Sequence, residues 1–84
     1  MNSRWKQKNK PASLETKFIF DDYETLRTFL DDLADVAENL NHHPNLSFGR
    51  THVSVIIYST DDDLQDVDIA LAEGIDECFH RVTS

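Results

Sequence analysis

The chain is short and strongly acidic, which excludes several classes of protein. It has 84 residues, a net charge of −8 and a single cysteine, Cys78. A domain this short buries only about 60% of its unfolded surface, so a homo-oligomer, most simply a homodimer, is expected. One cysteine allows neither an internal disulfide nor a structural zinc site. We therefore expect no metal. Because no apolar run approaches the roughly 20 residues of a membrane helix and the N-terminus is polar, we also expect a cytoplasmic protein that does not associate with a membrane.

The charge is unevenly distributed along the chain. Residues 1–17 contain five of the eight Lys and Arg residues and only one of the sixteen acidic residues, Glu15. The remaining body is therefore strongly anionic and repels a phosphate backbone. We expect no nucleic-acid binding.

Residues 1–12 are expected to form a basic N-terminal arm ahead of a domain spanning residues 13–84. In MNSRWKQKNKPA, basic residues alternate around Trp5 and precede Pro11, without a helical or strand period that a core could use. Two interpretations stay open. The arm is a disordered terminus, or Trp5 docks on this subunit, a neighbouring copy or a partner.

The domain begins with a predicted strand and helix. Alternation of side chains over residues 14–20 predicts a strand with one mostly apolar face. Asp21 or Asp22 can cap the helix that follows. Its apolar residues form one stripe: Leu26, Phe29, Leu30, Leu33, Val36, Ala37 and Leu40. Asn41 and Pro44 are expected to end this helix.

Two strands and a second helix complete the predicted order. Residues 46–48 suit a short strand, Gly49 a turn or bulge, and His52–Tyr58 a longer strand. Residues 61–63 are three aspartates that predict a turn, whose last residue, Asp63, can cap a helix with an apolar stripe over residues 64–82. They lack the spacing of calcium ligands in an EF-hand loop. The order β-α-β-β-α predicts an α+β fold, a curved antiparallel sheet with two helices packed on one face.

The adjacent histidines His42 and His43 are the one constellation that indicates chemistry. Histidine side chains in general can exchange protons near neutral pH, so a pair can donate to and accept from a small substrate. The alternative interpretation is structural: histidines at a helix end cap free carbonyls and interact favourably with the helix dipole.

The segments Glu38-x-x-x-His42-His43-Pro44 and Asp68-Ile69-Ala70-Leu71-Ala72 carry a family resemblance. Across roughly residues 14–82 the chain resembles the pterin-4a-carbinolamine dehydratases, which dehydrate a carbinolamine on the pterin ring without a metal or cofactor. The resemblance implies His42, His43 and Asp68 as catalytic residues. The family's third histidine falls at Thr60, and Arg50 replaces a usual aromatic residue. With this incomplete site we do not expect efficient dehydration, while weak activity and pterin binding stay open.

A second resemblance accounts for these departures. Trp5-Lys6, Pro11 and above all the motif Ser47-Phe48-Gly49-Arg50-Thr51 look like the divergent dehydratase-like proteins encoded beside α-carboxysome genes, which are RuBisCO assembly factors. The resemblance implies a chaperone-like dimer in the cytoplasm, in association with carboxysomes, that presents Trp5, Phe48 and Arg50 to RuBisCO large subunits. The bland alternatives are core packing for Phe48 and a surface ion pair for Arg50.

Two other functions stay open at this point. One is an active pterin-4a-carbinolamine dehydratase, a lyase that uses His42 and His43. The other is a transcriptional or dimerisation cofactor, by analogy with the second role of some dehydratases.

Overall fold

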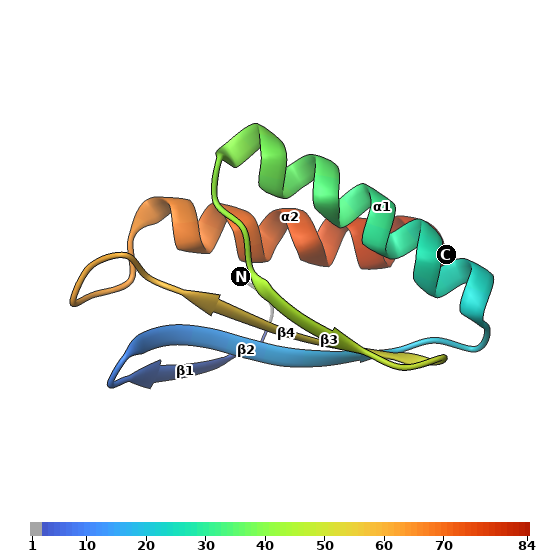
Figure 1. Ribbon diagram of the computed structural model, residues 1–84, viewed down its shortest axis with the longest axis horizontal. Helices are drawn as coiled ribbons and strands as arrows, with labels where there is room; N and C mark the ends of the chain where they lie inside the picture. The colour runs from blue at the N-terminus through green and yellow to red at the C-terminus, as the bar shows by residue number, and fades with distance from the viewer. Residues whose placement is uncertain (1–2) are drawn as a thin grey trace.

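A computed structural model describes residues 3–84 and shows a four-stranded sheet with two helices on one face (Figure 1). The sheet is antiparallel throughout, in the order β1-β2-β4-β3. The elements are β1 (Lys6–Asn9), β2 (Ala12–Ile19), α1 (Tyr23–Leu40), β3 (Asn45–Phe48), β4 (His52–Tyr58) and α2 (Asp66–Thr83). The predicted α+β class is confirmed, and the predicted β-α-β-β-α order is confirmed from β2 to α2.

The N-terminal segment differs from the prediction, because it contributes a strand. Lys6–Asn9 forms β1, which pairs with β2 through a tight turn at Lys10-Pro11. The expectation of an arm outside the sheet is therefore wrong for these residues, while residues 1–2 lie outside the described part. The alternating lysines have the period of a strand, but their charge gives the strand no apolar face to indicate it. The apolar residue that anchors the segment, Trp5, lies just before the strand.

The ends of the helices follow from local hydrogen bonds. The Asp22 carboxylate caps α1 by accepting the Thr25 amide hydrogen at 2.7 Å, a bond that lowers the pKa of Asp22. Asn41 closes the helix in the left-handed conformation, with φ of 52°. Asp22 is one of the two aspartates predicted to cap this helix, and Asn41 ends it as predicted. The second helix is capped by Gln65 and not by Asp63, because the Asp68 side chain accepts the Gln65 amide hydrogen at 2.8 Å in a capping-box arrangement.

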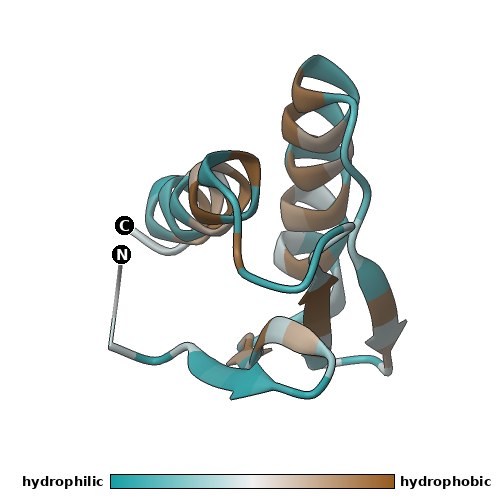
Figure 2. Cartoon of the chain, turned by 90° about the vertical axis from the view of Figure 1, so that its left-hand side faces the viewer, coloured by the Kyte–Doolittle hydropathy of each residue, from teal (hydrophilic) through white to brown (hydrophobic). Residues whose placement is uncertain are grey.

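The core lies between the sheet and the two helices. Its strand residues are Leu14, Phe18, Val53, Val55 and Ile57, and its helix residues include Leu26, Phe29, Leu33, Leu71 and Ile75. Phe18, Phe20, Phe29 and Phe79 form an aromatic cluster with ring centroids 4.8 to 6.1 Å apart. Figure 2 shows hydrophobic segments on both helices and a hydrophilic β1 along the sheet edge.

At Gly74 the two helices pack closely against each other. A Cβ atom placed there would lie 2.6 Å from Cγ1 of Val36. Glycine in a helix interior costs about 1 kcal/mol relative to alanine, so its presence requires a compensating reason. The reason is steric, since Val36 is stiff at χ1 and packed against the core.

We therefore expect Gly74→Ala to reduce the free energy of unfolding by about 1–3 kcal/mol despite the gain in helix propensity, because it overpacks the interface. In a Val36→Ala background the same change should be neutral or stabilising. Urea unfolding of the four variants in this cycle tests the sign reversal. A Gly74→Ala protein as stable as the wild type would show that the helices separate without cost.

Candidate functional site

The ends of the two helices meet at a histidine–aspartate pair. His42 follows the C-cap of α1, and Asp68 lies in the first turn of α2. His42 Nε2 is 2.6 Å from Asp68 Oδ1, and the other carboxylate oxygen accepts the Gln65 amide hydrogen at 2.8 Å. An ionised carboxylate can only accept, and with Asp68 in that state Nε2 of His42 donates the hydrogen of the short contact.

The Asp68 carboxylate is fully buried, with an exposed fraction of 0%. Burial of a charge is tolerated here because both oxygens are hydrogen-bonded and the N-terminus of α2 favours a negative charge. The His42 side chain keeps 12% of its surface exposed. With Nε2 held by Asp68, Nδ1 is the ring atom that can exchange a proton, so the pair has the chemistry of a general acid or base.

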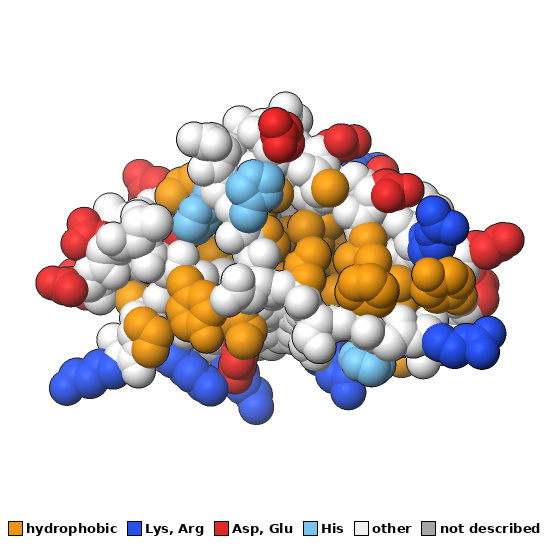
Figure 3. Space-filling model, in the orientation of Figure 1, with side chains coloured by type: hydrophobic (Ala, Val, Ile, Leu, Met, Phe, Trp, Pro, Cys, Tyr) orange, Lys and Arg blue, Asp and Glu red, His pale blue; other side chains and the backbone are white. Residues whose placement is uncertain are grey.

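The other residues of the predicted catalytic set are less constrained. His43 is exposed and makes no hydrogen bond or ion pair within residues 3–84. Thr60 is exposed in the loop between β4 and α2, where the resemblance would require a histidine. Figure 3 shows histidine side chains where α1 gives way to β3, above a band of hydrophobic side chains. The structure thus brings His42 and Asp68 together and leaves only a hydroxyl at Thr60.

No metal-like cluster accompanies this pair in the described residues. Across residues 3–84, no three His, Cys, Asp or Glu side chains gather as a metal ion would require. In the same range neither helix combines the length and apolar character needed to cross a membrane.

Edge strand β3 carries the second group of predicted site residues. Phe48 is 53% exposed and Leu46 40%, so core packing of Phe48 is wrong. Arg50 is exposed in the turn after β3 and makes no ion pair within residues 3–84, so the expected surface pair with an aspartate is also wrong. Gly49 donates its amide hydrogen to His52 O at 3.0 Å, and a Cβ atom there would lie 2.6 Å from the His52 imidazole. The motif therefore forms a tight turn that presents Arg50 beside Phe48.

Trp5 belongs to the protein's own core and is only 6% exposed. Its indole Nε1 donates to both oxygens of Asp76, each at 3.0 Å, and its ring meets the edge of Phe18. The guanidinium of Arg4 lies over the Phe18 and Phe79 rings, 5.0 and 4.9 Å from their centroids. Docking on this subunit is therefore the correct interpretation, and the expectation that Trp5 faces a partner is wrong. No sequence signal pairs Asp76 with a tryptophan seventy-one residues earlier.

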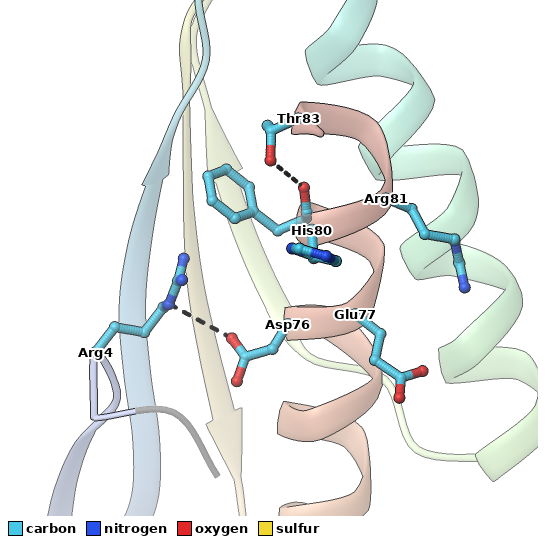
Figure 4. Close-up of a pocket in the computed structure, with 7 residues that line it drawn as sticks. Arg4, Asp76, Glu77, His80, Arg81 and Thr83 are labelled. Atoms are coloured by element: carbon cyan, nitrogen blue, oxygen red, sulfur yellow. Dashed lines mark hydrogen bonds and ion pairs between the residues drawn. The ribbon is translucent and has the colours of Figure 1, made fainter.

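Another surface hollow lies along the C-terminal half of α2. It encloses about 560 Å³ and is lined by Arg4, Asp76, Glu77, Phe79, His80, Arg81 and Thr83. Figure 4 shows Arg4 directed at Asp76, and their Nε and Oδ1 atoms are 3.6 Å apart. Arg4 and Asp76, the charged residues at its centre, already face each other, so their contact holds the N-terminal segment against α2. The His42–Asp68 pair therefore remains the candidate for chemistry.

Comparison with known proteins places these features in a family. A sequence profile described as pterin 4 alpha carbinolamine dehydratase matches residues 1–78. A relative from Saccharolobus islandicus (strain M.14.25 / Kamchatka #1), named after these dehydratases, is 31% identical over 99% of this chain and 85% of its own length. A relative of the same name from Azoarcus sp. (strain BH72) is 35% identical over 61% of this chain. The chain spans 44% of that protein.

Two solved structures share the fold. One is described as a pterin dehydratase-like protein identified as a RuBisCO assembly factor in the alpha-carboxysome. Its TM-score is 0.83 at 32% identity, over 93% of this chain and 92% of that one. The other, a transcriptional coactivator/pterin dehydratase from Brucella melitensis, has a TM-score of 0.83 over 90% of this chain and 82% of that one. At 23% identity it shows the fold alone.

The His42–Asp68 contact should contribute measurably to stability. We expect His42→Ala to lower the free energy of unfolding by about 1–3 kcal/mol, because a buried carboxylate oxygen loses its partner. His43→Ala is the matched control and should change it by less than about 0.5 kcal/mol, since that side chain is exposed. Urea unfolding measures both. Equal effects of the two substitutions would mean that water replaces the His42 contact at no cost.

Proposed function

The chain belongs to the pterin 4 alpha carbinolamine dehydratase family, and we propose that it acts within this family as a RuBisCO assembly factor. In this proposal it binds the large subunit during folding or assembly, in the cytoplasm and in association with carboxysomes. The observation that carries the proposal is the exposed Phe48 followed two residues later by Arg50, which makes no ion pair within residues 3–84. The 32% identity to a structure described as such a factor supports it.

The β3 surface, defined here as Leu46, Phe48 and Arg50, has the chemistry of a binding site. Phe48 is about half exposed, and burial of that remaining aromatic surface would stabilise a complex by about 1 kcal/mol. Arginine and aromatic side chains are enriched among residues that dominate binding energy. The edge of β3 also leaves backbone donors and acceptors that an extended partner segment can pair with.

The charge of Arg50 gives this surface direction. Its guanidinium makes no ion pair within residues 3–84, so it is available for a carboxylate of the partner. Arginine binds carboxylates through two parallel hydrogen bonds, which fixes orientation as well as affinity. The glycine at position 49 allows this turn, because a side chain there would meet the His52 imidazole.

Dehydration of a pterin carbinolamine is the second candidate function, favoured by the 2.6 Å His42–Asp68 contact. Removing one cooperating acid–base group typically reduces a rate by about 10²–10⁴-fold, and Thr60 supplies no such group. We therefore expect purified protein to dehydrate a pterin carbinolamine no faster than buffer, with an authentic dehydratase as the positive control. Activity well above the blank that is lost in both His42→Ala and His43→Ala would support the enzyme instead.

The homodimer expected from the chain's small size is part of the proposal, since a second copy would add buried apolar area. Light scattering on the purified protein measures this directly.

Substitutions on the β3 surface should separate binding from folding. We expect Arg50→Ala and Phe48→Ala each to reduce the yield of assembled RuBisCO at least several-fold in a co-expression host, because residues that anchor an interface typically contribute about 2 kcal/mol or more. Both side chains are exposed, so circular dichroism and the melting temperature should be unchanged.

Arg27→Ala is the matched control, since Arg27 is an exposed arginine on α1 outside the β3 surface. Its yield should equal that of the wild type. If Arg50→Ala and Phe48→Ala also retain full yield, the β3 surface is not the contact with RuBisCO.

A further inference from the structure

The outer face of the sheet, opposite the helices, is uncovered. Leu14 and Phe18 of β2 are buried on the helix side, so Glu15 and Lys17, which alternate with them along the strand, point outward. Residues opposite each other on paired strands share a face, and the register pairs Lys6 with Glu15, Lys8 with Ser13 and Lys17 with Ser54. The outer sheet face is therefore defined by Lys6, Lys8, Ser13, Glu15, Lys17, Ser54 and Ile56.

Positive charge dominates this face of an otherwise acidic molecule. Glu15 is the only acidic residue in the four strands of the described chain, and its Oε1 lies 2.9 Å from Lys8 Nζ. Lys6 and Lys17 are exposed and make no ion pair within residues 3–84. Figure 3 shows Lys and Arg side chains along the lower border, beneath the sheet, while most Asp and Glu side chains surround the helices and the loop before α2.

The outer sheet face is also hollowed and partly apolar. A depression of about 280 Å³ is lined by Arg4, Lys6, Glu15, Thr16, Lys17, Ser54, Val55 and Ile56. Two exposed hydrophobic residues share the face by register, Ile19 at 62% exposed and Tyr58 at 41%. Apolar contact area ringed by like charges is the composition of a protein-binding surface.

Protection of a sheet edge explains only part of this pattern. Lysines on an edge strand prevent unwanted pairing with other chains, which is sufficient for Lys6 and Lys8 on β1. Lys17 lies on β2 beyond the segment Ala12–Glu15 that pairs with β1, so edge protection applies to it as well. It does not account for the exposed Ile19 and Tyr58, which add apolar surface to the same face.

We propose that the outer sheet face is a docking surface for an acidic, partly apolar segment of a partner polypeptide. Charge complementarity selects this occupant: carboxylates of the segment pair with Lys6 and Lys17, and its apolar side chains contact Ile56. The proposal is independent of the β3 surface, because Leu46 and Phe48 are paired with the buried Val55 and Val53 and so point to the helix side. A result that contradicts binding at the β3 surface therefore leaves the proposal for the outer sheet face unaffected, and the reverse also holds.

A nucleic acid fits this face less well than a polypeptide. Glu15 lies among the lysines, and residues 18–84 carry fifteen acidic residues against three Lys and Arg residues, an excess of negative charge that repels phosphates. A nucleic-acid site normally neutralises several phosphates with Lys and Arg side chains. An exposed apolar side chain such as Ile19 makes no such contact.

A labelled peptide of alternating glutamate and leucine is the probe for this surface. Fluorescence anisotropy at low salt should detect binding that weakens as salt is added. In Lys6→Glu/Lys17→Glu we expect affinity to fall at least about tenfold, equivalent to 1.4 kcal/mol. Arg27→Glu/Arg81→Glu changes the net charge equally on the helices and should retain the wild-type affinity. NMR amide shifts should concentrate on the strands.

Lys6→Gln/Lys17→Gln, which adds no repulsion toward Glu15, should weaken binding to a smaller extent and guards against misfolding of the charge-reversed variant, checked by circular dichroism. Equal losses in the strand and helix variants, or no loss in either strand variant, would overturn the proposal. Tighter binding of single-stranded DNA with the same number of charges would also overturn it, in favour of a nucleic acid.

Discussion

The buried carboxylate of Asp68 is the constraint on which the arrangement of both helices depends. One oxygen accepts the Gln65 amide hydrogen and so begins α2, and the other binds His42, immediately after α1 ends. A single side chain therefore joins the C-terminal end of one helix to the N-terminal end of the other. Because an unpaired buried carboxylate is costly, both contacts must form together for the charge to be tolerated.

Because Asp68 bonds to both Gln65 and His42, the presence of His42 has a structural explanation as well as a catalytic one. If the histidine were only a catalytic group, its retention in a chain with Thr60 at the third histidine position would be evidence for residual activity. The hydrogen bond to a fully buried Asp68 supplies a structural reason to keep it. Retention of the pair is therefore compatible with a protein whose function is binding.

Periodicity and capping chemistry predicted most of the fold from local sequence. The stripe of α1, the cap at Asp22, the left-handed Asn41 and the strand His52–Tyr58 all follow from interactions within a few residues. The β1 strand did not, because its stability comes from pairing with β2 and from the distant Trp5–Asp76 contact. The Gln65 cap was not predicted either, because it depends on the Asp68 side chain accepting the Gln65 amide hydrogen. The resemblance implied a catalytic role for Asp68 and gave no indication of this capping bond.

The candidate site divides along the same line between local and long-range information. Sequence similarity placed His42 and Asp68 in one site, and their contact at 2.6 Å agrees with that placement. The exposure of Phe48 depends on β3 being an edge strand beyond the cover of the helices, which no short motif reveals. Burial of Trp5 likewise depends on α2 supplying Asp76. The Trp5–Asp76 contact anchors the N-terminal segment and so holds the lysines that follow on the sheet. The contact that buries Trp5, and makes it unable to face a partner, therefore also positions the basic residues of the outer sheet face.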